Sequence, residues 1–174
     1  MAHLTRSLLI ALLAAACGGE SPGSGAGAAS GGGSASNEDF DPCALLTSEE
    51  IQAASGWAPD TSAAKTYGTT KTCAYHGEDV MKQSVVLIVA RPAPKVSSSA
   101  ELVERRTKAA ASDPDIKMTF TAIEDLGMPA VRSEVEGAPA PTVEVVVGSR
   151  LLAVTAGDFE SSKTLAGKAA GRLR

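Results

Sequence analysis

The chain has 174 residues, of which 16 are Lys or Arg and 20 are Asp or Glu, so its formal net charge is -4. A mildly acidic chain lacks the basic stripe that a phosphate backbone requires, and only 3% of its residues are aromatic, so we expect no nucleic-acid partner. The length is typical of one domain, and no apolar stretch approaches the ~20 residues that span a bilayer.

Residues 1–16 have the layout of a secretory signal peptide. Arg6 supplies one positive charge, and the following ten residues read SLLIALLAAA, a short apolar run that ends in small residues. Removal of this leader, in which Arg6 is the only charged residue, leaves a mature chain with a net charge of -5. The leader predicts export from the cytoplasm.

Cys17 follows the small residues directly, and the segment Leu13-Ala14-Ala15-Ala16-Cys17 resembles a bacterial lipobox. The resemblance implies cleavage after residue 16, transfer of diacylglycerol to the sulfur and acylation of the new amine, with palmitate as a typical chain. Each buried methylene contributes roughly 0.8 kcal/mol, so a lipid with two or more chains gives a stable anchor. We therefore expect a lipoprotein of the cell envelope, held to the membrane through Cys17 and, because Gly18 follows, to the outer membrane where a cell has one.

The segment 17–38 is predicted to be a lipidated cysteine followed by a disordered tether. Residues 18–36 contain eight Gly, five Ser and four Ala. Such a composition cannot bury enough apolar surface to offset the entropy of ordering the chain. As a random coil, the tether would span about 25 Å root-mean-square.

Residues 39–174 are predicted to form a single folded domain, and its first helix has clear boundaries. Thr47 and Glu50 have the spacing of a capping box, and Gly56 provides a stop, so we expect a helix over about 48–55.

Cys43 and Cys73 are the two cysteines that remain after Cys17. Thiols pair in an oxidising compartment, so we predict a disulfide between them. Two alternatives stay open, namely free thiols and a metal site that would add His76 and a carboxylate. The second lacks the closely paired ligands of structural zinc sites, so we expect no metal.

The remainder of the chain predicts a mostly antiparallel sheet with two further helices. The run SVVLIVA at 84–90 is typical of a central strand, and Ser98 with Glu101 repeats the capping-box spacing. Gly148-Ser149 suits a two-residue hairpin turn, in which Val145 would face Leu152. The expected elements are strands at 84–90, 116–122, 131–135, 143–147 and 150–155, and helices at about 98–111 and 160–173. The fold class is therefore α+β.

The segment Asp-Pro-Cys-Ala-Leu-Leu-Thr at 41–47, with a second cysteine in Thr-Cys-Ala-Tyr at 72–75, resembles a family of small bacterial lipoproteins of unknown function. The segment 124–130 is similar to a Leu-Gly-Asp-x-Ala turn of that family, with Met128 in place of the acidic residue. The resemblance implies an α/β/α sandwich, like that of photosystem-associated and nuclear-transport accessory proteins. It implies no established activity and no cofactor.

The residues favour binding over catalysis. A nucleophilic triad needs a base, and His76 is the only histidine after the leader. Carboxylate pairs such as Asp113 with Asp115 are explained by turns, so we assign no catalytic residue. A hydrolase that uses carboxylates or His76 remains the alternative, as does a structural subunit of an envelope complex.

Trp57, Tyr67, Tyr75 and His76 lie in or beside the loop that the predicted disulfide closes. They form either a small core around the disulfide or a surface for an envelope protein or a small ligand, because Trp and Tyr are favoured in binding hot spots. The sequence thus predicts a non-catalytic binding module, with these four residues as the candidate surface. Arg105, Arg106 and Lys108 form a basic cluster that is expected to be a solvated helix face, with contact to phospholipid as the alternative.

Overall fold

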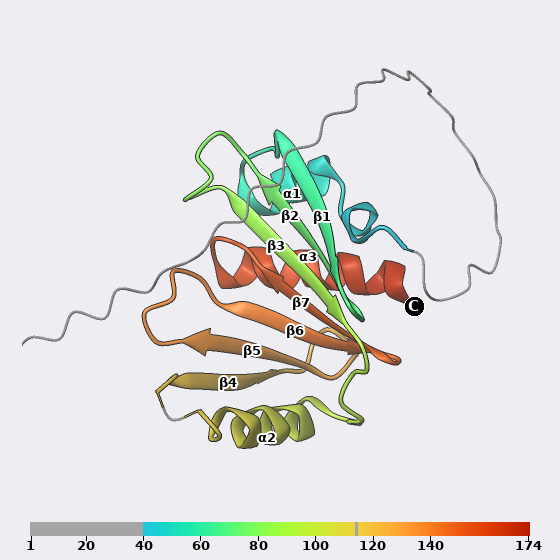
Figure 1. Ribbon diagram of the computed structural model, residues 1–174, viewed down its shortest axis with the longest axis vertical. Coiled ribbons are helices and arrows are strands. Elements are labelled where there is room, and N and C mark those ends of the chain that lie inside the picture. Colours follow the sequence, from blue (N-terminus) through green and yellow to red (C-terminus); the bar gives the residue numbers. More distant parts are fainter. Residues whose placement is uncertain (1–39, 114) are drawn as a thin grey trace, which may run out of the picture. The chain divides into compact units, whose positions relative to one another are not determined.

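The structure is a computed structural model that describes residues 40–113 and 115–174. The predicted signal peptide, the lipidation site at Cys17 and the tether lie outside these described residues. Within them, seven antiparallel strands form one sheet in the order β1-β2-β3-β7-β6-β5-β4, accompanied by three α-helices and a short 3-10 helix (Figure 1). The predicted α+β class, with a mostly antiparallel sheet flanked by helices, is confirmed. The elements in chain order are η1 (Pro42–Leu45), α1 (Ser48–Ser55), β1 (Thr61–Tyr67), β2 (Thr70–His76), β3 (Ser84–Ala90), α2 (Ser99–Ala110), β4 (Met118–Ile123), β5 (Ala130–Val135), β6 (Thr142–Val147), β7 (Arg150–Thr155) and α3 (Phe159–Leu173).

Side-chain hydrogen bonds set the helix starts. The Thr47 hydroxyl accepts from the Glu50 backbone N–H, and the Glu50 carboxylate accepts from the Thr47 N–H, which completes the predicted capping box of α1. Ser98 caps α2 by accepting from the Glu101 N–H, while the Glu101 carboxylate accepts from the Ser97 N–H. Asp158, which the sequence reasoning did not single out, caps α3 through the Ser161 N–H.

Two hairpins have two-residue turns that begin with glycine. Gly148 joins β6 to β7 with a φ of 58°, a left-handed conformation that favours glycine, and the predicted register of Val145 with Leu152 is confirmed. Gly68 joins β1 to β2 with the same φ. The β1–β2 hairpin itself was not predicted.

The main core lies on one face of the sheet, between the strands and the helices η1, α1 and α3. Alternate residues of the central strands point into this core, for example Val85, Leu87 and Val89 of β3, which are all buried. We call this face the covered face. The stripe predicted along the last helix is also buried in it, through Leu165, Ala169 and Leu173.

The opposite face is covered only at one end. There α2 packs against β4 and β5, and a second core forms around the buried residues Leu102, Val131 and Val146. Figure 1 shows α2 at the β4 end of the sheet, away from β1 and β2. No helix of the described chain packs against the other half of this face, which we call the open face.

Candidate interaction surface

The middle of the open face carries mostly small, uncharged side chains, while Lys65 and Tyr67 of β1 lie at its edge. Strand alternation and register place two residues of each of three adjacent strands side by side on it. All are half-buried except Ile88, which is 37% exposed. We call this set the open sheet patch, and its members are Thr72 and Ala74 of β2, Val86 and Ile88 of β3, and Ala153 and Thr155 of β7.

The composition of this patch is unusual for a surface exposed to water. Charged residues make up 21% of the chain, yet none of the six patch residues is charged. The centres of protein–protein interfaces are depleted in charge, whereas the solvated face of an antiparallel sheet normally carries polar and charged residues. The patch therefore has the composition of an interface centre.

Hollows lie at both ends of the patch. A groove of about 890 Å³ runs along α2, with Pro92, Ala93 and Leu151 among its apolar lining residues. A smaller hollow of about 400 Å³ is lined by Val86 and Thr155 of the patch and by Met81, whose side chain is 92% exposed. The smaller hollow is thus continuous with the patch, whereas the groove along α2 combines apolar with charged side chains.

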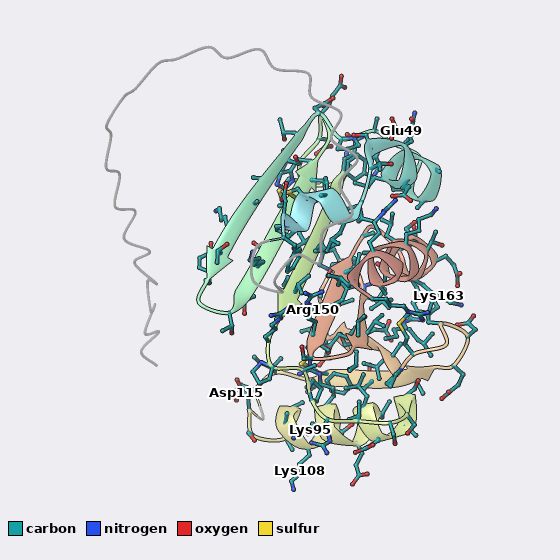
Figure 2. All side chains as sticks on the ribbon, turned by 90° about the vertical axis from the view of Figure 1, so that its right-hand side faces the viewer. Glu49, Lys95, Lys108, Asp115, Arg150 and Lys163 are labelled. Carbon is teal, nitrogen blue, oxygen red and sulfur yellow. A yellow bond between two sulfur atoms is a disulfide. The ribbon has the colours of Figure 1, made fainter. Side chains whose placement is uncertain are left out.

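Ion pairs line the α2 side of the larger groove. Arg106 pairs with Glu144 of β6, with 2.5 Å between the Arg Nη2 and Glu Oε2 atoms, and Glu144 is only 8% exposed. Arg105 pairs with Glu101 one turn earlier on α2 at 3.2 Å. Lys108 is exposed and points away from the sheet in Figure 2. Two of the three members of the predicted basic cluster are thus held in pairs.

The disulfide between Cys43 and Cys73 is present, with 5.2 Å between the Cα atoms. It joins η1 to β2 on the covered face. Tyr75 lies two residues further along β2, is 4% exposed and donates a hydrogen bond of 2.8 Å to the Cys43 carbonyl oxygen. Burial raises the pKa of Tyr75 to about 12. Trp57 is half-buried against the same core. These contacts favour the small-core alternative for Tyr75 and Trp57.

Tyr67 and His76 lie elsewhere. Tyr67 ends β1, is 62% exposed and pairs with Thr70, whereas His76 ends β2 and pairs with Thr61. Strand alternation puts both side chains on the open face, but at opposite ends of the β1–β2 hairpin. The structure therefore divides the four predicted residues between the two faces of the sheet and does not bring them into one cluster.

Several carboxylates of the described residues are engaged by cations and backbone groups. Glu50 accepts hydrogen bonds from both terminal nitrogens of Arg172, at 2.7 and 3.0 Å, and these bonds lower its pKa to about 2. Asp125 is paired with Lys163, which lowers the pKa of Asp125. No group of three or more His, Cys, Asp or Glu residues within 40–113 and 115–174 is placed to hold a metal ion.

The sequence reasoning missed the open sheet patch. It treated 84–90 as a central strand, which is correct for the strand order, since β3 lies between β2 and β7. The run of Val, Leu and Ile does not tell which of its two faces is covered. Thr72 and Ala74 do not mark this face in the sequence either, because alanine is also common in the core, as at Ala130 and Ala169.

In comparisons with protein-family models, curated proteins and solved structures, the chain matches none. Among the described residues, none of the helices has both the length and the apolar character needed to cross a bilayer. The functional argument therefore depends on the residues themselves.

Proposed function

We propose that this protein is a lipid-anchored module of the bacterial cell envelope whose domain binds a protein partner through the open sheet patch. The anchor is Cys17, supported by the leader and the lipobox-like segment that precede it. The domain is a non-catalytic adaptor. The observation that carries the proposal is an uncharged patch on the half-face of the sheet that no helix of the described chain covers.

The shape of the patch supports a protein partner. Ile88 and Val86 supply apolar contact at its centre, and the threonines beside them offer hydroxyls for hydrogen bonds. Flat surfaces of this kind suit another protein, while a small molecule needs a concave pocket that surrounds most of its area. The anchor holds the surface close to the membrane, within the reach of the tether, so partners in the envelope are favoured.

A small ligand in the groove along α2 is the second candidate. The volume of about 890 Å³ lies within the usual range for ligand sites, and apolar Leu102 and Leu151 form part of its lining. The Arg106–Glu144 pair at its side would orient a polar group. Occupancy of this groove would protect residues of α2, and not the centre of the patch, from chemical labelling.

The anchor is tested with Cys17→Ala in cells that express the full chain. We expect loss of metabolic fatty-acid label and loss of detergent partitioning, because the sulfur that receives the diacylglycerol is removed and the later acylation of the amine depends on that step. Ser21→Ala is the matched control, since it changes a residue of the predicted tether and leaves both the lipobox-like segment and the disulfide intact. Equal label in Cys17→Ala and the native protein would refute the anchor.

The binding surface is tested with a photo-crosslinking residue at position 72, in the anchored protein. We expect a crosslinked product that Ile88→Lys abolishes, because a buried lysine without a partner opposes association. Ile116→Lys is the control, since Ile116 is 47% exposed and lies outside the patch. Crosslinking that survives Ile88→Lys, or no product at all, would contradict binding through this patch.

A further inference from the structure

The edge strand β1 has features that point to a second surface, separate from the open sheet patch. All seven of its residues are exposed, and β2 is the only strand that pairs with it among the described residues (Figure 1). Its pairing with β2 is continuous from Thr61 to Tyr67, with no bulge. The strand contains neither Pro nor Gly and only one charged residue, Lys65. Apart from Lys65, the strand therefore lacks the features that usually prevent a further strand from pairing with an edge, namely proline, bulges and charged side chains.

The residues of β1 can pair favourably with those of a second, antiparallel copy of the same strand. The strand reads TSAAKTY, with Ala64 at its centre. An antiparallel copy related by a two-fold axis through this centre would place Thr61 opposite Tyr67, Ser62 opposite Thr66, and Ala63 opposite Lys65. Each of the first two pairs occurs twice, and each is a stabilising cross-strand type, namely a β-branched residue with an aromatic one and a hydroxyl with a hydroxyl. No like charges stand directly opposite each other.

We propose that two copies of this chain associate through β1, so that the two sheets join into one. The seven-residue pairing supplies roughly one backbone hydrogen bond per residue. It also covers Tyr67, the most exposed aromatic side chain of the described domain at 62% exposure. The opposite edge of the sheet is less suited, because α2 packs on β4 and leaves its residues partly buried.

The contact buries little surface area, so its stability depends on the high local concentration that a membrane anchor would provide. Pairing along one strand buries less area than the roughly 1,200 Å² that specific stable interfaces require. Two domains tethered to the same membrane face share a thin layer, which raises their local concentration. We therefore expect the dimer on the membrane, and mostly monomer for the same chain at low concentration in free solution.

Disulfide crosslinking in cells tests both the contact and its register. The variant Thr61→Cys with Tyr67→Cys places two cysteines opposite two cysteines, with Cα atoms about 5 Å apart, within reach of a disulfide. Each single variant is the matched control, because its own thiols would lie six residues out of register, about 20 Å apart. We expect a product of twice the mass in the double variant, and in cells that express the two single variants together, but in neither single variant alone.

Charge at position 63 gives a second readout, independent of thiols. Ala63→Lys sets two lysines opposite each other at two symmetric places, whereas Ala63→Glu sets a carboxylate opposite Lys65. In the crosslinkable double variant, we expect Ala63→Lys to lower the yield of dimer roughly tenfold relative to Ala63→Glu. Both substitutions change the isolated strand to a similar extent, so equal melting temperatures would confirm that the folded monomer is unaffected.

The outcomes separate this inference from the proposed function. Equal crosslinking in the single and double variants, or none in any of them, would overturn dimerisation through β1 and leave the open sheet patch untouched. If Ala63→Lys and Ala63→Glu gave the same yield of crosslinked dimer, the proposed pairing of position 63 with Lys65 would be wrong. Two other results bear on the proposed function alone. They are an acyl label that persists in Cys17→Ala and a crosslink from position 72 that survives Ile88→Lys.

Discussion

The carboxylate of Glu50 connects the two ends of the folded domain. It accepts from the Thr47 backbone in α1 and from Arg172 near the end of α3, and Lys168 lies 3.5 Å away. Arg172 also donates to the Leu45 carbonyl oxygen at 2.6 Å. The substitution Glu50→Gln keeps the size and an acceptor for the cap but removes the charge. It therefore isolates the electrostatic part of this connection.

The hydrogen bonds from Arg172 lower the pKa of Glu50 from 4.5 to about 2. In a fully enclosed pair, this difference would correspond to roughly 3 kcal/mol of unfolding free energy. The Glu50 side chain is 18% exposed and that of Arg172 39%, so water screens the pair and we expect about 1–2 kcal/mol. Because the folded pKa is lower than the unfolded one, this stabilisation is complete above about pH 4.5 and disappears as the pH falls towards 2.

Urea unfolding of the native protein and of Glu50→Gln from pH 7 to pH 2.5 measures this difference. We expect the native protein to be more stable at pH 7 and the two free energies to converge in acid. Glu49→Gln is the matched control, since Glu49 lies in the same turn and points away from α3 in Figure 2, with no ion pair among the described residues. Hydrogen bonds from its own backbone N–H and from Thr47 lower the pKa of Glu49, so we expect a smaller loss of stability than for Glu50→Gln, and this loss also fades in acid. A stability difference for Glu50→Gln that stays constant down to pH 2.5 would refute the electrostatic explanation.

Two further predictions concern the disulfide and the aromatic residues. Replacing Cys43 and Cys73 together with serine should lower the free energy of unfolding by about 2–5 kcal/mol in urea titrations, and a loss below about 0.5 kcal/mol would contradict a stabilising bond. Tyr75→Ala should cost about 3–5 kcal/mol because it empties a buried site, whereas Tyr67→Ala should leave the melting temperature nearly unchanged because its side chain is exposed. Comparable melting shifts for the two tyrosine variants would show that the assigned burial is wrong.

Local rules predicted much of this fold. The capping box at Thr47 and the glycine after 55 defined α1 within one residue, because each end of a short helix is set by a few specific hydrogen bonds. The turn at Gly148 fixed the register of β6 and β7 in the same way. The hairpin of β1 and β2 was not predicted because β1 is exposed along its whole length and β2 buries only Cys73 and Tyr75, so no long apolar alternation marks it. Its stability comes from pairing with β3 and from the disulfide at Cys73.

The open sheet patch could not be predicted, because cover on a sheet face depends on where a distant helix packs. Leu102, Val131 and Val146 lie on three separate elements. Their contact in the second core holds α2 over β4 and β5. Nothing within 84–90 indicates that this helix stops short of β3. The residues at the uncovered positions agree with that arrangement, since Thr72 and Ala153 are small and Ile88 is the one large apolar side chain of the patch that is more than a third exposed. That balance is what a surface needs when it must stay soluble alone and still release bound water on contact with a partner.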